Sequence, residues 1–270
     1  MSSSPTPRPA TKACALEQLL LRAGFAGTVP NSRAANLRAI ERLLAGEPFY
    51  TFGIRRIEKA LAEGMLDQEG AIRVMARACG CRDADQFLGE QGYIGPKAAA
   101  AGLLEMSRWL AEAAEKRWTV ALGTGHPGSM LGCYIHLAEW LRDRGCDIAP
   151  VPVAHPAGVD WWADELGGVA ITSDGCGILH GHGVRVMESV LDRTEVDIVI
   201  ADHGFAGAAV NARVACLAVM DTNDPALGIA HALGCPELLV VPLYDNLPNG
   251  TTRQLAAWLI SLAEDRLKLD

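Results

Sequence analysis

The chain has 270 residues, of which 50% are hydrophobic and 21% are charged, so it can bury a sizeable core and lacks the composition of a disordered protein. Its 24 Lys and Arg against 32 Asp and Glu give a formal net charge of −8, which argues against a surface that neutralises nucleic acid. Residues 1–12 are polar and lack the apolar core of a signal peptide, and no apolar run reaches the roughly 18 residues of a membrane span. We therefore expect a flexible tail at 1–12 and a cytoplasmic protein that binds neither nucleic acid nor a membrane.

Helical patterns dominate residues 13–116. Asn31 and Ser32 can cap a helix, and they precede apolar residues that recur at helical spacing. Pro96 then opens a long run of strong helix formers. The other helices that the pattern predicts fall in the segments 53–63, 68–79 and 83–90. No stretch rich in β-formers interrupts this part of the chain, so we predict an all-helical N-terminal region at 13–116.

Residues 117–270 have the pattern of an α/β domain. Short runs of apolar residues, such as TVALG, DIAPVPV, VDIVIA, VACLAVM and ELLVVPL, alternate with amphipathic helices. Such runs predict a mostly parallel, Rossmann-like sheet that helices cover. The string SDGCG between two apolar runs is typical of a turn and predicts an inserted β-hairpin. The Gly- and Ala-rich segment from Gly204 to Ala209 is interpreted as a turn.

Polar residues follow four of the predicted strands. The carboxyl ends of parallel strands meet at one edge of a sheet, which is where α/β proteins bind their ligands. Each of these residues alone is consistent with an ordinary helix cap or turn. The residues that this rule brings to one edge are His126, Asp202, His203, Asp221, Asp224 and Asp245. We therefore expect a functional site along that edge.

Carboxylates that cluster at one edge repel one another, so they need a compensating cation. A divalent metal ion is the expected cofactor, with Asp202, Asp221, Asp224 and Asp245 as its predicted ligands. Oxygen ligands favour Mg²⁺ or Mn²⁺, whereas nearby histidines also allow Zn²⁺. The sequence leaves open whether His180 and His182 are ligands.

A glycine-rich turn with Gly123, Gly125 and Gly128 lies between a predicted strand and a helix. This spacing matches the dinucleotide-binding fingerprint, but the acidic residue expected at the end of the second strand is missing. The more general prediction is that amides at helix N-termini bind the phosphate of a ligand. The predicted phosphate-binding residues are Thr124, Gly125, Gly128, Ser129 and Gly204.

Five strings of the sequence are familiar as a set: TGHPGSML, SDGCGILHGHG, DIVIADHGFAGAA, DTNDPAL and PLYDN. In this order, over roughly residues 118–250, they resemble a family of largely uncharacterised bacterial proteins, many from actinobacteria, that are described as phosphatases. The resemblance implies a hydrolase whose substrate is a phosphate ester.

The leading hypothesis is a metal-dependent phosphoric monoester hydrolase that acts on a small phosphorylated metabolite. Its predicted catalytic residues are His126, His180 and His203, with His203 as general acid or base because the ordinary pKa of histidine lies near neutrality. One alternative is a lyase or cyclase that acts on a small carboxylic acid at the same site. Others are a dinucleotide-binding Rossmann oxidoreductase and a ligand-binding protein without a metal. A homo-oligomer is left open.

Overall fold

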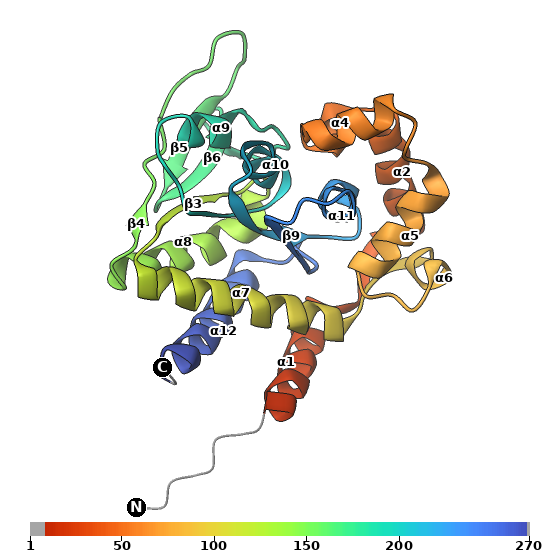
Figure 1. Cartoon of the computed structure of the whole chain (residues 1–270), viewed down its shortest axis with the longest axis horizontal. Coiled ribbons are helices and arrows are strands. Elements are labelled where there is room, and N and C mark those ends of the chain that lie inside the picture. Colours follow the sequence, from red (N-terminus) through yellow and green to blue (C-terminus); the bar gives the residue numbers. More distant parts are fainter. Residues whose placement is uncertain (1–8, 269–270) are drawn as a thin grey trace, which may run out of the picture.

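The computed structural model describes residues 9–268 and has an α/β fold, as the sequence predicts (Figure 1). A mixed, mostly parallel sheet has the strand order β10-β9-β8-β3-β6-β5. Its parallel part consists of β3 (Thr119–Gly123), β8 (Ile198–Ala201), β9 (Ala215–Met220) and β10 (Leu238–Pro242). These strands are largely buried runs of small and branched apolar residues, which suits a sheet covered on both faces.

The predicted β-hairpin is present. Strand β6 (Val169–Ser173) lies parallel to β3 and pairs antiparallel with β7 (Ile178–Leu179) across the turn. In that turn the Asp174 carboxylate accepts hydrogen bonds from the amides of Cys176 and Gly177, at 2.9 and 2.7 Å. Strand β6 also pairs with β5 (Trp162–Leu166), which the sequence did not predict.

The apolar run DIAPVPV forms a strand only at β4 (Asp147–Ile148), which pairs with β3. The prediction of a full strand here was wrong. Pro150 and Pro152 have no amide hydrogen to donate, so the ladder cannot continue past the first residues of the run.

Five helices accompany this half of the chain: α8 (Pro127–Asp143), α9 (Arg185–Leu191), α10 (His203–Ala212), α11 (Pro225–Ala232) and α12 (Asn249–Leu267). The segment interpreted as a Gly- and Ala-rich turn is in fact helix α10, and residues 203–210 are all buried. Its small residues allow close packing: a Cβ at Gly207 would overlap the carbonyl of Phe52. Tertiary packing of the helix thus outweighs its weak local propensity.

The N-terminal part contains α1 (Pro9–Ala23), α2 (Arg33–Leu44), α3 (Pro48–Thr51), α4 (Arg55–Ala62), α5 (Gln68–Ala78), α6 (Ala84–Phe87) and α7 (Pro96–Lys116). The Ser32 hydroxyl caps α2 by accepting a hydrogen bond from the Ala35 amide. Helix α6 is much shorter than the segment predicted. Helix α1 begins inside the predicted tail, whose residues 1–8 lie outside the described part of the chain.

The prediction of an all-helical N-terminal region was wrong. Strand β1 (Gly27–Ser32) pairs antiparallel with β2 (Gln91–Ile94) in a separate small sheet. Both strands are short, and each finds its partner far away in the sequence, so neither leaves a clear local pattern.

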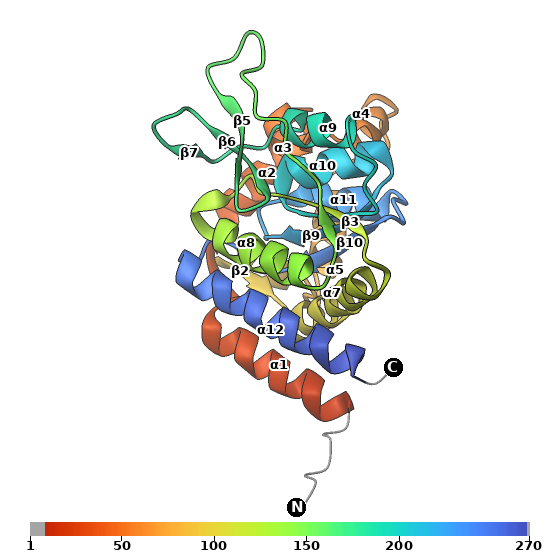
Figure 2. The same cartoon turned by 90° about the vertical axis from the view of Figure 1, so that its left-hand side faces the viewer.

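Two hydrophobic clusters lie on opposite faces of the central sheet, since Val120 of β3 belongs to one and its neighbour Ala121 to the other. The first includes residues of α1, α7, α8 and α12, which lie together in Figure 2. The second joins α2, α4 and α5 to α10 and α11. The N-terminal helices therefore pack onto the α/β part and reach the edge where its strands end. None of the described helices is both long and apolar enough to cross a membrane.

Candidate metal centre and active site

A cavity of about 380 Å³ opens where β3, β8, β9 and β10 end, at the edge that the sequence predicts; we call it the catalytic cavity. It is lined by Asn31, Phe49, Tyr50, His126, His180, His182, His203, Asp221, Asn223, Asp224, Asp245 and Asn246. Four histidines and three carboxylates converge there, and none of the lining residues is Lys or Arg.

Asp202 is completely buried and does not line the catalytic cavity. Its carboxylate accepts hydrogen bonds from the Thr124 hydroxyl and the Gly125 amide, both at 2.7 Å, and from Nδ1 of His203 at 2.8 Å. Burial alone would raise the pKa of Asp202, but His203 and these hydrogen bonds lower it below its ordinary value. The carboxylate is thus ionised and fully used inside the protein, where it orients the His203 ring.

His203 is the first residue of α10, and its φ of 47° is rare for a residue other than glycine. With Nδ1 bound to Asp202, the Nε2 atom lies 3.5 Å from a carboxylate oxygen of Asp224. Burial lowers the pKa of His203, but the charges of Asp224, Asp202 and Asp245 outweigh burial and raise it to about 10. The surrounding carboxylates therefore stabilise the positively charged form of the His203 ring.

His180 and His182 face each other across the cavity wall, with their Nε2 atoms 3.0 Å apart. Nδ1 of His182 donates to the carbonyl oxygen of Phe49 at 2.7 Å, because a carbonyl can only accept. The neutral ring of His182 then has a lone pair at Nε2. Burial and the neighbouring His203 lower the pKa of both rings, to about 4 for His180 and further for His182, so both are neutral near pH 7.

His126 and Asp245 form a third set of donor atoms. Nδ1 of His126 lies 3.2 Å from Oδ1 of Asp245, but the two atoms lack the geometry of a hydrogen bond. The other oxygen of Asp245 is buried and has no hydrogen-bond partner among the residues that the structure describes. Two potential metal-ligand atoms that are close but not hydrogen-bonded, together with a carboxylate oxygen that lacks a partner, are consistent with a shared metal ion.

Within residues 9–268, two groups of residues present ligand atoms that lie within 4.8 Å of one another inside each group: His180, His182 and His203, and His126, His203 and Asp245. The second ring nitrogen of His182 and of His203 is bound to a carbonyl and a carboxylate respectively. This is the arrangement that metal-binding histidines have in proteins, because the outer partner fixes the tautomer. Nδ1 of His203 is bound to Asp202, so only Nε2 can lose its proton and bind a metal, and the residue can serve one ion.

Asp221 and Asp224 complete the acidic lining. The Asp221 carboxylate accepts from the side chain of Asn31 at 2.7 Å and from the Thr222 amide at 2.6 Å. Burial and the neighbouring carboxylates, Asp245 in particular, raise the pKa of Asp221 well above its ordinary value. Burial also raises the pKa of Asp224, to about 6, although His203 opposes the shift. Without a cation the carboxylates of this cavity repel one another.

The sequence matches known proteins over almost the whole chain. A sequence profile of the family described as Phosphatase matches residues 11–266. The chain belongs to this phosphatase family. It is 30% identical over 238 residues to Phosphatase SCO2771 of Streptomyces coelicolor, an alignment that covers 86% of this chain and 88% of the relative. No solved structure matches it.

None of the residues predicted to bind phosphate lines the catalytic cavity of the phosphatase. The Thr124 hydroxyl and the Gly125 amide donate to Asp202. The Ser129 amide donates to the His126 carbonyl, and its hydroxyl accepts from an amide of the loop before α12. These three residues thus use their polar groups inside the protein. Gly128 is exposed and Gly204 lies at the start of α10, and their role in phosphate binding stays a prediction.

Two of these glycines have another reason to be glycine. A Cβ at Gly125 would overlap the carbonyl oxygen of Gly181, and one at Gly204 would overlap that of His182. The Gly181 amide also donates to the Gly125 carbonyl at 2.9 Å. The missing side chains therefore let the loop with His180 and His182 lie directly against the starts of α8 and α10.

The N-terminal part supplies three residues of the catalytic cavity that the sequence did not predict. Asn31 precedes α2 and was interpreted only as a helix cap, whereas Phe49 and Tyr50 lie in the short helix α3. The Phe49 ring stacks on His182 at a centroid distance of 3.6 Å and is 47% exposed. No local pattern indicates these roles, because the residues reach the site only through the packing of N-terminal helices on the sheet.

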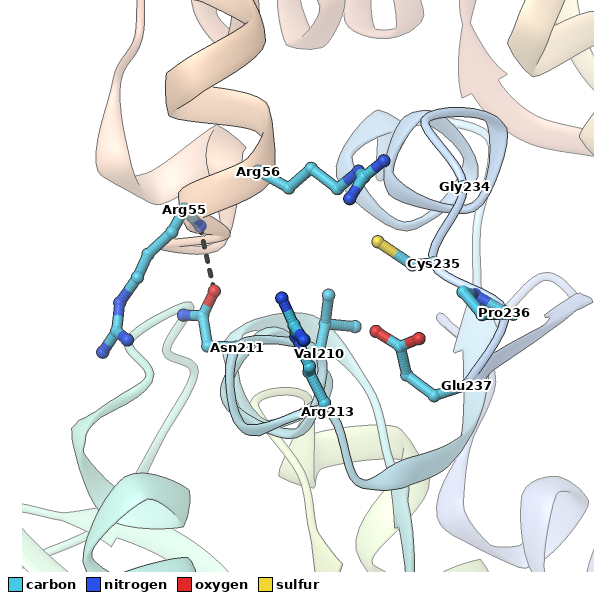
Figure 3. A pocket seen from close by; sticks show the side chains of 9 residues that line it. All are labelled: Arg55, Arg56, Val210, Asn211, Arg213, Gly234, Cys235, Pro236 and Glu237. Carbon is cyan, nitrogen blue, oxygen red and sulfur yellow. Dashed lines mark hydrogen bonds between the residues drawn. The ribbon is translucent and has the colours of Figure 1, made fainter.

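Arginine side chains gather around a different cavity of about 520 Å³, which we call the arginine cavity (Figure 3). Arg55, Arg56 and Arg213 line it, at the C-terminal ends of α10 and α11. Arg56 donates to the carbonyl of Leu233 at 2.7 Å, just beyond the end of α11. The amide of Arg55 donates to Asn211, as Figure 3 shows.

Proposed function

We propose that this phosphatase hydrolyses the phosphomonoester of a small metabolite with the help of a divalent metal ion in the catalytic cavity. One observation carries the proposal: three buried carboxylates line the cavity and no Lys or Arg accompanies them. Two like charges about 4 Å apart repel by about 4 kcal/mol near a protein surface. A phosphate dianion beside these carboxylates therefore needs more positive charge than the His203 ring can supply.

The proposed metal ligands include histidines, whereas the ligands predicted from the sequence are four aspartates. His203 belongs to both groups of converging ligand atoms, with His126 and Asp245 in one and with His180 and His182 in the other. Asp202 is proposed to be a positioning residue, because its oxygens already accept three hydrogen bonds. Nitrogen donors shift the preference from Mg²⁺ toward Mn²⁺ or Zn²⁺.

We propose that residues around the cavity orient the side chains that bind the metal ion. Asp202 holds the Nδ1 proton of His203, and the carbonyl of Phe49 holds that of His182, so both Nε2 atoms point toward the cavity. Asn31 fixes the Asp221 carboxylate in the same way. A divalent ion bound to the side chains oriented in this way would supply the positive charge that polarises a phosphoryl group and activates water.

The dinucleotide alternative loses support at the glycine-rich turn. The Gly125 amide, which would face a pyrophosphate, donates to Asp202, and Gly181 lies against its backbone. For the lyase or cyclase alternative, no specific observation favours a carboxylic-acid substrate over a phosphate ester.

The test is release of inorganic phosphate. The purified protein is stripped of metal with a chelator, reloaded separately with Mn²⁺, Zn²⁺ and Mg²⁺, and incubated with p-nitrophenyl phosphate and small phosphorylated metabolites. We expect turnover only after reloading, together with a stoichiometric bound ion by elemental analysis. Full turnover by the stripped protein would disprove the metal requirement. Loss of water from a carboxylic acid without phosphate release would support the lyase.

A further inference from the structure

We infer that the substrate is the monophosphate of a neutral, polyhydroxylated alcohol such as a sugar, with a single anionic group. This inference rests on the proposed function, since it concerns the alcohol that leaves when the phosphate ester is hydrolysed. Its basis is the set of residues that line the catalytic cavity and are neither histidine nor aspartate. We call this the leaving-group wall, and it consists of Asn31, Phe49, Tyr50, Asn223 and Asn246.

All residues of the leaving-group wall are uncharged. Three side-chain amides and a phenol supply both donors and acceptors, which is the set that matches hydroxyl groups. Asn31 uses its amide nitrogen on Asp221, Thr222 and Asn223, whereas its carbonyl oxygen has no hydrogen-bond donor among the described residues. A hydroxyl of the substrate can donate to that oxygen.

Phe49 adds an apolar surface to this wall. One face of its ring covers His182, yet the residue remains 47% exposed, which is unusual for phenylalanine. A buried aromatic surface contributes strongly to binding. Phe49 lines the same cavity as the three amide side chains, so the cavity suits a molecule with both hydroxyl groups and a C–H face, as a sugar ring has.

A second anionic group on the substrate would find no partner here. The guanidinium of Arg42 lies 5.8 Å from the centre of the Tyr50 ring but is paired with Glu47 at 2.8 Å. The arginine cavity lies at the far ends of α10 and α11. A bisphosphate or a phosphorylated carboxylic acid would therefore place its extra charge near Asp221 and Asp224 without compensation.

The first part of the test compares substrates on the metal-loaded protein. The monophosphates are glucose 6-phosphate, ribose 5-phosphate and glycerol 3-phosphate, and the probes with extra charge are fructose 1,6-bisphosphate and 3-phosphoglycerate. We expect kcat/KM for the best monophosphate to exceed that for either charged probe by about tenfold or more. Equal or faster hydrolysis of a charged probe would overturn the inference while the proposed function stands. No phosphate release from any compound would instead overturn the proposed function.

The second part tests the wall itself. Phe49→Ala should raise KM for the best monophosphate about fivefold, with kcat and bound metal within twofold of the wild type, because the ring contacts the alcohol and not the reacting phosphate. Tyr50→Phe removes only a hydroxyl and should raise KM less. Met65→Ala, at a 63% exposed residue outside the cavity, is the control and should change neither constant. An unchanged KM in Phe49→Ala, or loss of metal, would overturn the inference, since the ring would then act only on His182.

Discussion

Helices α10 and α11 each extend from one cavity to another, and the charged side chains that line the two cavities differ. Their N-terminal ends carry His203 and Asp224 into the catalytic cavity, where the charged side chains are carboxylates and histidines. Their C-terminal ends border the arginine cavity. Positive side chains near helix C-termini and negative ones near N-termini both complement the helix dipole. The arginines therefore have a structural reason to lie where they do, and they are too far along the helices to bind a phosphate beside His203.

Under the proposed function, a bound ion supplies the positive charge that the substrate phosphate needs at the catalytic end. Replacement of residues at the two ends should therefore have very different consequences. Changes at the catalytic end should remove metal and turnover, whereas changes at the arginine end should affect only stability.

The largest effect is expected for His203→Ala. The variant loses the one residue that belongs to both groups of converging donors, so bound metal should fall and kcat/KM should drop on the order of 1,000-fold. Elemental analysis and a phosphate-release assay measure the two quantities. If bound metal stays at the wild-type level and only the pH dependence of the rate changes, His203 is the general acid or base that the sequence predicts and not a ligand.

Asp202→Asn should have the next largest effect. The change is nearly isosteric, but the amide has no negative charge to hold the Nδ1 proton of His203 and cannot accept all three hydrogen bonds. We expect metal affinity or kcat/KM to fall about 10- to 100-fold. A circular dichroism spectrum like that of the wild type would show that the fold is kept, and wild-type turnover would contradict the positioning role.

Gly125→Ala and Gly128→Ala form a matched pair in one turn. The added methyl group overlaps Gly181 in the first variant and meets open space in the second. Gly125→Ala should push away the loop with His180 and His182, lower the stability by about 1–3 kcal/mol and weaken metal binding. Thermal unfolding and metal titration measure both effects. Gly128→Ala should match the wild type in stability, and a raised KM in this variant alone would support the predicted role of Gly128 in phosphate binding.

The smallest effect is expected at the other end of the helices. Arg56→Ala removes the hydrogen bond to the Leu233 carbonyl and should destabilise the fold by about 1 kcal/mol or less. Turnover and bound metal should stay within twofold of the wild type. A large loss of phosphatase activity would break the comparison, because the arginine cavity would then take part in the reaction.

The sequence by itself determined the α/β fold and the edge on which the site lies. Strands β3, β8, β9 and β10 are recognisable as short apolar runs, and parallel strands bring the residues that follow them to one edge. His126, Asp221 and Asp245 could therefore be assigned to the cavity without knowledge of any contact. The hairpin at Asp174 was also predictable, because turn residues act locally.

Only the tertiary structure decided which atoms face the cavity and which residues complete it. Asp202 follows its strand as Asp221 does, yet it faces the Thr124 turn, because its orientation depends on hydrogen bonds to residues distant in the sequence. Phe49 enters the site through the packing of α3, just as β1 forms only by pairing with β2. Hydrophobic periodicity and turn chemistry are local and can be read from neighbouring residues. Side-chain orientation and long-range pairing depend on residues that are neighbours only in the folded chain.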